Sequence, residues 1–288
     1  MRKTGDSVEM APGLRGIKFS RDWITRPLFA VLLAAVAVYA IFKGKPYLEI
    51  ATAVVVLLGA REWHRMVGAG RFFAELATSA AVLCLALGAF VLWPHDRLLP
   101  LLILGAGTVA VFTVGLLRRN QPLWQAAGVL YLGLPALAII VLRDSEARDA
   151  WVLIGLFLIV WATDTGAFLV GNLIGGPRLA PVLSPNKTWA GFIGGIVAAA
   201  AIEAIFLLAI GGNPVWGAVF GGGMAVIAHF GDLFESWAKR CFHVKDSGSM
   251  IPGHGGVLDR IDSTLATLVA LAVLVLALKL DPLFGAFS

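Results

Sequence analysis

The feature that most constrains this chain is a succession of apolar segments that are too long for an ordinary soluble domain. Several of them, such as 72–93 and 150–172, exceed the roughly 18 residues that mark a membrane-spanning helix. Only 14% of the 288 residues are charged, whereas an average soluble domain carries about 25%. The sequence therefore predicts an all-α, polytopic integral membrane protein.

We expect nine transmembrane helices. The second segment is the shortest, and the eighth contains Gly217 and the run Gly221–Gly223, which would let neighbouring helices approach closely. The nine apolar segments are 27–42, 47–60, 72–93, 99–117, 124–142, 150–172, 188–210, 214–235 and 261–280.

The distribution of Lys and Arg predicts which side of the membrane each connection faces. With the N-terminus inside, 17 of the 23 Lys and Arg fall in inside segments and 6 in outside segments. Cytoplasmic loops carry the excess of positive charge, so we expect an N-in, C-out orientation in the inner membrane. The chain then divides into a basic cytoplasmic tail (1–26), N-terminal transmembrane helices (27–149) and C-terminal transmembrane helices with the longer cytoplasmic loops (150–288).

Asp164 is a carboxylate inside the apolar segment 150–172. A charged side chain in a spanning helix costs at least about 2.5–3.5 kcal/mol on insertion scales, and such residues usually face a polar interior. Gly171 follows seven residues later and shares the helix face of Asp164. Two interpretations are open: Asp164 lines a polar active cavity, or it is hydrogen-bonded to a neighbouring helix in a structural role.

A second polar group continues the eighth segment beyond its apolar part. Asp232, Glu235, Ser236, Lys239 and Arg240 occupy positions i, i+3, i+4, i+7 and i+8, which places all five on one helix face. A solvated amphipathic face with pairs three or four residues apart would show the same spacing. Because the stripe begins inside an otherwise apolar segment, we favour a functional site.

The third polar group is the loop that follows, together with the start of the last helix. Residues 247–256 are rich in glycine, and their exposed amides could cradle phosphate oxygens. Asp259 and Asp262 stand three residues apart at the predicted start of the last helix. Acidic residues there are also ordinary partners of the helix dipole, so a structural role for Asp262 is as well supported as a functional one.

These three groups supply carboxylates for a hard cation and basic side chains for phosphates. Oxygen ligands suit Mg²⁺, which often binds through one or two carboxylates together with substrate phosphates. The sequence has no Cys and His cluster of the zinc-binding kind, and no Walker A, GxSxG or HExxH motif. We therefore expect a magnesium site for phosphate chemistry on the cytoplasmic side.

The segment from Ser236 to Asp262 resembles the signature of the phosphatidate cytidylyltransferases, also called CDP-diacylglycerol synthases. Two upstream runs, 164–167 and 179–191, also resemble segments of this family. Ala238 and Phe168 depart from the family pattern, and Phe168 argues against a catalytic hydroxyl at that position. The matching signature residues are Ser236, Lys239, Arg240, Lys245, Asp246, Gly248, Ile251, Pro252, His254, Gly255, Gly256, Val257, Asp259, Arg260, Ile261 and Asp262.

The resemblance implies a reaction of CTP with phosphatidic acid that gives CDP-diacylglycerol and pyrophosphate. It implies Mg²⁺, a second, monovalent cation such as K⁺, and a homodimer among membrane lipids, with no nucleic acid involved. The implied catalytic residues are Asp232, Asp259, Lys239 and Arg260. The implied substrate-binding residues are Ser184, Asn186, Lys187, Ser236, Arg240, Lys245, Asp246, His254, Gly255 and Gly256, and the carboxylates for cations are Asp232, Asp259, Asp164, Glu235 and Asp246.

Two other functions stay open at this point. A CTP-dependent transferase that acts on another lipid phosphate, of an isoprenoid or ether lipid, would need the same residues. An ion-coupled transporter would use Asp164 and Asp232 as intramembrane ion sites. Against transport, nine segments do not divide into equal repeats, and the signature lies at the membrane surface rather than at its midplane.

Overall fold

The computed structural model describes residues 22–143, 147–248, 250, 255–279, 281 and 283. Within this part of the chain it contains nine α-helices, a short π-helical turn and one two-stranded hairpin. The helical, membrane-type architecture predicted from the sequence is confirmed. Most of the predicted cytoplasmic tail lies outside the described residues.

The helices follow the predicted apolar segments, because a helix pairs its backbone N–H and C=O groups internally where lipid offers no partners. The first five are α1 (Asp22–Lys43), α2 (Tyr47–Gly68), α3 (Phe73–Leu92), α4 (Leu98–Leu117) and α5 (Pro122–Leu142). The others are α6 (Ala147–Ile174), α7 (Trp189–Ala209), α8 (Pro214–Cys241) and α9 (Leu258–Ala272), and α9 continues into the π-helical turn Val273–Ala277.

Seven helices, α3 to α9, are long and apolar enough to cross a membrane. The segment Val31–Lys43 of α1 is also apolar, but it is shorter than these seven helices. Helix α2 carries Arg61, Glu62 and Arg65 among its 22 residues. Length and composition thus support seven spans in the described part of the chain, and the total of nine stays a prediction.

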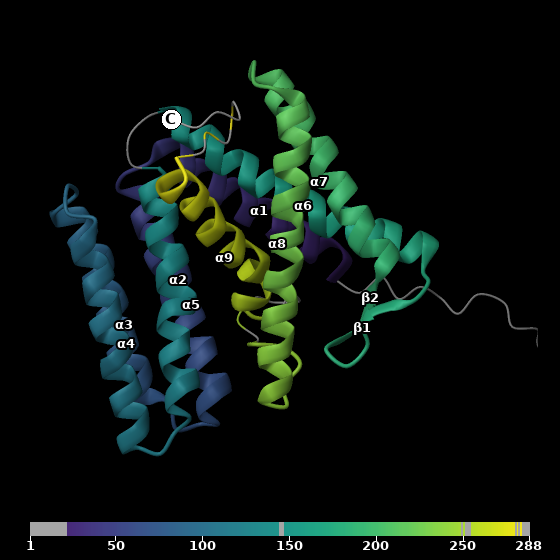
Figure 1. Cartoon of the computed structure of the whole chain (residues 1–288). Helices are drawn as coiled ribbons and strands as arrows, with labels where there is room; N and C mark the ends of the chain where they lie inside the picture. Colours follow the sequence, from purple (N-terminus) through teal and green to yellow (C-terminus); the bar gives the residue numbers. More distant parts are fainter. Residues whose placement is uncertain are drawn as a thin grey trace, which may run out of the picture.

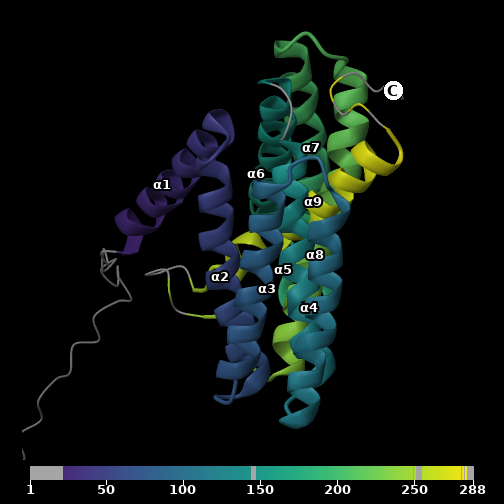
Figure 2. The ribbon, with the colours of Figure 1, turned by 90° about the vertical axis from the view of Figure 1, so that its left-hand side faces the viewer.

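The helices form two groups with α9 between them. Helices α6, α7 and α8 pack against one another, and α2 to α5 form the second group (Figure 1). Helix α9 contacts α2, α5, α6 and α8. Helix α1 leans away from the bundle and touches α2 and α6 (Figure 2).

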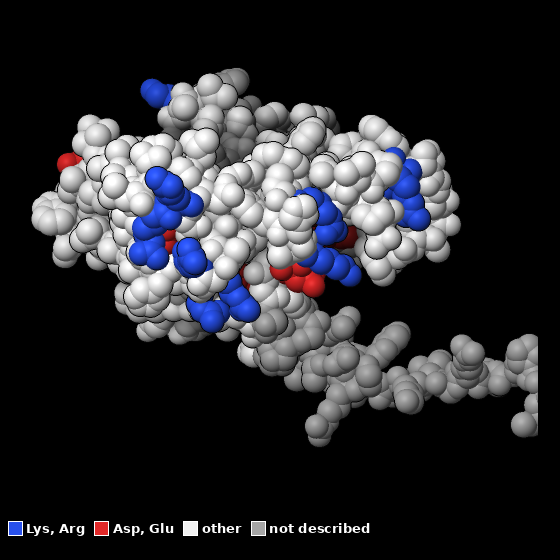
Figure 3. Space-filling model, turned by 90° about the horizontal axis from the view of Figure 1, so that it is seen from below, with Lys and Arg blue, Asp and Glu red and all other residues white. Residues whose placement is uncertain are grey.

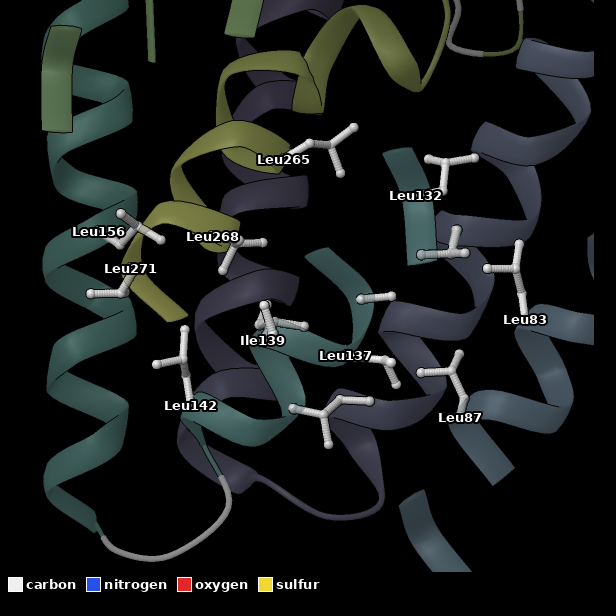
Figure 4. Close-up of a cluster of buried hydrophobic side chains, with 14 of the residues drawn as sticks. Leu83, Leu87, Leu132, Leu137, Ile139, Leu142, Leu156, Leu265, Leu268 and Leu271 are labelled. Carbon is white, nitrogen blue, oxygen red and sulfur yellow. The ribbon is translucent and has the colours of Figure 1, made fainter. Parts of the chain in front are cut away.

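Aliphatic side chains fix the position of α9. Leu265, Leu268 and Leu271 recur every three residues, which places them on one side of the helix, and none is more than 5% exposed. Figure 4 shows Leu271 beside Leu156 of α6, and Leu268 and Leu265 on the side toward Ile139 and Leu132 of α5. Since close packing is a main source of helix association in lipid, this core also fixes the polar residues in the first turn of α9.

The connections predicted to be cytoplasmic lie at one end of the bundle, the lower end in Figure 1. Asn120 Nδ2, after α4, donates to the carbonyl of Arg71, between α2 and α3, at 2.6 Å. Figure 3 looks onto this end and shows Lys and Arg gathered on it. The structure thus groups the basic connections as predicted, and the assignment of this end to the cytoplasm stays a prediction.

Two features differ from the sequence prediction. Helix α2 runs to Gly68 rather than ending near residue 60, because charged residues on the helix surface do not interrupt its backbone hydrogen bonds. The predicted loop 173–187 contains a hairpin of β1 (Arg178–Ala180) and β2 (Ser184–Thr188), with Arg178 paired to Thr188. Thr188 then caps α7, since its Oγ1 accepts a hydrogen bond from the backbone N–H of Gly191 at 3.0 Å.

Candidate active site

The polar stripe predicted after the eighth apolar segment exists, because α8 continues without a break to Cys241. Ser236 Oγ donates to Asp232 Oδ1 at 3.5 Å, and Lys239 Nζ donates to Glu235 Oε2 at 2.9 Å. Members of each pair are one helical turn apart. The side chain of Glu235 is 1% exposed, so the stripe lies against other elements rather than in open solvent.

The start of α9 brings a second carboxylate to Lys239. Lys239 Nζ also donates to Asp259 Oδ1 at 2.7 Å, so one ammonium group bridges Glu235 and Asp259. Asp259 Oδ2 further accepts hydrogen bonds from the backbone N–H of Ser247 at 3.1 Å and of Gly256 at 2.8 Å. Hydrogen bonds to a charged acceptor are stronger than neutral ones. We call the segment 242–257 the signature loop; its described residues Ser247 and Gly256 are therefore tied to Asp259 from both ends of the segment.

The hairpin between α6 and α7 forms another wall of the site. Lys187 on β2 makes an ion pair with Asp232, and both side chains are partly exposed. Arg240 Nε donates to the carbonyl of Leu183 in the hairpin turn at 3.3 Å, which ties the end of α8 to the hairpin. Ser184 is half-buried and Asn186 is exposed on the same hairpin, so the structure brings the predicted hairpin residues to the end of α8.

Two further carboxylates belong to the same electrostatic neighbourhood. Asp164 of α6 is exposed, and its carboxylate is attracted by the ammonium of Lys187 and repelled by the carboxylate of Asp232. The carboxylate of Asp262 of α9 is repelled by that of Asp232 and lies close to that of Glu235. We call this set the charged cluster; its acidic members lie beside basic side chains at the end shown in Figure 3. It consists of Asp164, Lys187, Asp232, Glu235, Lys239, Asp259 and Asp262.

Other predicted site residues lie elsewhere. Asp246 is exposed and lines a hollow with Arg65 and Met66 of α2, on the α2 side of the signature loop. Lys245 is exposed beside it. His254 lies outside the described residues. The described residues that line this hollow include Ser247 but none of the carboxylates of the charged cluster.

Gly255 and Arg260 complete the predicted set. Gly255 has a φ of +82°, and a Cβ atom there would lie 2.9 Å from Asp259 Oδ2, so the position favours glycine both by conformation and by space. Arg260 is exposed in the first turn of α9 and interacts with Asp164. Both residues therefore border the charged cluster through Asp259 or Asp164.

Glu62 of α2 also shapes the site, although it is not among the residues predicted from the sequence. Its Oε2 accepts hydrogen bonds from the backbone N–H of Leu258 at 2.9 Å and from Ser247 Oγ at 3.3 Å. These partners stand 196 and 185 positions later in the chain. No local sequence pattern links Glu62 to these distant partners. The one sequence feature that could have drawn attention to Glu62 is its place as an acidic residue at the basic end of an apolar segment.

Comparison with known proteins identifies the family of the chain. The model of the cytidylyltransferase family matches residues 24–278. The chain belongs to the cytidylyltransferase family. The match runs from α1 to the π-helical turn, so it includes both groups of helices and the whole charged cluster. The family resemblance of the signature is thereby confirmed.

Individual cytidylyltransferases support the same assignment. The chain is 45% identical to the phosphatidate cytidylyltransferase of Brucella suis over 144 residues, which are 50% of this chain and 53% of that protein. It is 33% identical to the phosphatidate cytidylyltransferase of Staphylococcus saprophyticus over 186 residues, or 64% of this chain and 72% of that protein. The chain spans about half the length of the first curated relatives that it matches.

The charged cluster offers oxygen ligands of the kind that Mg²⁺ takes. Asp232 is partly exposed, and Glu235 Oε1 is buried with no hydrogen-bond partner among the described residues. The ammonium of Lys239 already occupies a cation position between two carboxylates. Among the described residues, no group of three or more His, Cys, Asp or Glu forms a ready metal site. The residues therefore fit a cation that shares its ligands with substrate phosphates.

Proposed function

We propose that the protein transfers the cytidylyl group of CTP to phosphatidic acid and releases pyrophosphate, giving CDP-diacylglycerol. The charged cluster carries this proposal, because Lys187 and Lys239 meet Asp232, Glu235 and Asp259 at the basic end of a membrane bundle. The names of the relatives support the choice of substrates.

The reaction joins two anionic substrates. A phosphate oxygen of phosphatidic acid attacks the α-phosphorus of CTP, a new P–O bond forms, and the bond to pyrophosphate breaks with its electron pair. A phosphomonoester has a second pKa of ~6, so the nucleophile is already anionic at neutral pH. The protein therefore needs no strong general base and has to supply charge neutralisation and in-line positioning.

The residues of the site divide these tasks. Lys239 is held between Glu235 at 2.9 Å and Asp259 at 2.7 Å, so its charge has a defined position from which it contacts phosphate oxygens. Lys187 supplies a second cation from the hairpin. Asp232 and Asp259 would hold Mg²⁺, which supplies charge neutralisation of the CTP phosphates and of the leaving pyrophosphate. Further contacts to CTP and to the lipid phosphate are assigned to Ser184, Asn186, Ser236, Arg240, Lys245 and Arg260.

We place this site at the cytoplasmic face of the inner membrane. The basic connections lie at the same end as the charged cluster (Figure 3), and such connections are enriched on the cytoplasmic side. The net charge of +5 favours anionic lipids there. A bound K⁺ and a homodimer stay predictions from the family resemblance. Turnover after replacement of K⁺ by Na⁺ would test the first, and the mass of the protein particle in detergent would test the second.

The test of the proposed function is pyrophosphate release by the purified protein in detergent. The protein receives CTP and Mg²⁺ with and without phosphatidic acid, and ATP serves as the control nucleotide. We expect release that requires both CTP and phosphatidic acid and stops when a chelator removes Mg²⁺. Release with an isoprenoid or ether lipid phosphate instead would keep the chemistry and change the acceptor. Folded protein that shows no CTP-dependent release with any lipid would contradict the proposal.

A further inference from the structure

We propose that Glu62 is a positioning residue, which holds the signature loop in the shape that presents Asp259 to Lys239. The importance of this loop for turnover rests on the proposed function. The hydrogen bonds by which Glu62 holds the loop are visible in the structure itself. The carboxylate comes from α2, in the group of helices that contributes none of the charged cluster.

One carboxylate oxygen of Glu62 joins the two sides of the loop. Oε2 accepts from Ser247 Oγ at 3.3 Å on the side that follows α8, and from the backbone N–H of Leu258 at 2.9 Å where α9 begins. Glu62 is only 1% exposed. In such a site water competes little, and hydrogen bonds to a charged acceptor are roughly twice as strong as neutral ones. Glu62 therefore sets the distance between the two sides of the loop.

The loop passes this constraint on to the charged cluster. The hydroxyl of Ser247 donates a hydrogen bond to Glu62, and the backbone N–H of Ser247 donates to Asp259 Oδ2 at 3.1 Å. Gly256, two residues before Leu258, donates its N–H to the same oxygen at 2.8 Å. Asp259 then holds Lys239 at 2.7 Å. A continuous series of contacts thus runs from α2 through both sides of the loop to the bridging ammonium.

Two glycines show how closely the loop is packed on Glu62. A Cβ atom at Gly256 would lie 2.6 Å from Glu62 Oε2, and one at Gly248 would lie 2.7 Å from Glu62 Cδ. Both distances are shorter than real Cβ contacts. Neither glycine has a positive φ, in contrast to Gly255. The backbone conformation does not require glycine at these two positions, whereas the approach to the carboxylate does.

Two substitutions distinguish the role of Glu62 as a hydrogen-bond acceptor from the effect of its negative charge. Glu62→Gln keeps a carbonyl oxygen that can accept from both Ser247 and Leu258, whereas Glu62→Ala leaves these two buried donors without an acceptor. His64→Ala is the matched control. His64 lies on the same helix and is 0% exposed, and its hydrogen bond within the described part of the chain is to Gln125 of α5.

The experiment combines steady-state kinetics with hydrogen exchange of the full-length protein in detergent. For Glu62→Ala we expect kcat to fall by about 10- to 100-fold, as for other groups that orient catalytic residues. The amides of Ser247, Gly256 and Leu258 should exchange faster than in the unchanged protein. Glu62→Gln should retain most of the activity and of the protection. His64→Ala should lower thermal stability without changing kcat or the exchange of these three amides.

A second variant keeps the test informative if Glu62→Ala fails to fold. Ser247→Ala removes only the hydroxyl contact, so kcat should fall by about 2- to 10-fold and the exchange of Gly256 and Leu258 should rise. Turnover and exchange equal to those of the unchanged protein in both variants would overturn the proposal. A fall in kcat with unchanged exchange would also overturn it, because Glu62 would then act directly on the reaction. If the unchanged protein shows no CTP turnover with any lipid, the proposed function fails, and the exchange data alone decide whether Glu62 holds the loop.

Discussion

The two groups of helices use polar residues in opposite ways. Between α2, α3 and α5, Glu75 and Gln125 are 0% exposed, and Glu75 accepts a hydrogen bond from Asn120 at 2.9 Å. Between the hairpin and α8, Lys187 and Asp232 pair while staying partly exposed. The buried polar groups of the first region join helices, whereas Lys187 and Asp232 in the second region are open enough to meet a ligand. We therefore interpret the N-terminal group of helices as a scaffold, which contacts the signature loop through Glu62.

Removal of Lys239 should have the largest effect in the second region. Lys239→Met leaves Glu235 and Asp259 without their shared cation, and breaking a buried ion pair in this way destabilises proteins by about 3–5 kcal/mol. We expect a matching loss of thermal stability in detergent together with loss of pyrophosphate release. The double variant Lys239→Met/Glu235→Gln should regain stability but not activity. Recovery of both would show that Lys239 has only a structural role.

Neutralising a carboxylate of the charged cluster should affect the rate more than the fold. For Asp232→Asn and for Asp259→Asn we expect a decrease in kcat of about 100- to 1,000-fold, the range seen when one charge-stabilising group is removed. Pyrophosphate release measures the rate, and thermal unfolding in detergent checks that the protein is intact. Turnover near that of the unchanged protein in either variant would make the assignment of that carboxylate wrong.

The opposite result is expected in the scaffold. Glu75→Ala removes the acceptor for Asn120 and the partner of Arg118, which lies at 3.4 Å. The free energy of unfolding should fall by about 1.5–3 kcal/mol, as for other hydrogen bonds to charged groups. Thermal unfolding and kcat are measured on the same preparation. A change in kcat of the folded protein would break the distinction between scaffold and site.

Packing inside the scaffold offers a smaller test with its own control on one helix. A Cβ atom at Gly107 of α4 would lie 2.8 Å from Val82 Cβ of α3, whereas one at Gly105 would meet nothing within 4 Å. Gly107→Ala should destabilise by about 1–3 kcal/mol through overpacking. Gly105→Ala should change the melting temperature little. Equal effects of the two substitutions would contradict the packing of α3 on α4.

The sequence predicted those parts of the site that depend on local spacing. The interval from Asp232 to Lys239 specifies one helix face, and the ion pair of Lys239 with Glu235 lies on that face as expected. The contact between Lys239 and Asp259 requires α9 to return to the end of α8, and spacing along the chain does not predict it. Apolar runs likewise predicted the helices, because length and hydropathy decide which segments can span a bilayer.

What the sequence did not predict depends on contacts between distant segments. Glu62 acts on residues at the far end of the chain, and its own helix was expected to end before it. Glu203 lies within an apolar segment of α7 and is 2% exposed, and no spacing to other polar residues pointed to its burial. The hairpin was missed because both strands are short and β2 contains Pro185; proline is uncommon within paired strands.

The central position of α9 has a consequence for how the protein is made. Helices that are synthesised earlier enter the membrane first, and domains generally form from the N-terminal side during translation. Helix α9 must then enter between two groups of helices that are already present, and it brings Asp259 with it. Asp232, Lys187 and Glu62 are synthesised before that moment, yet the series of contacts from Glu62 to Lys239 cannot close. The charged cluster is therefore completed only when α9 packs between the two groups of helices, and a nascent chain that stalls before α9 still lacks Asp259 and Asp262.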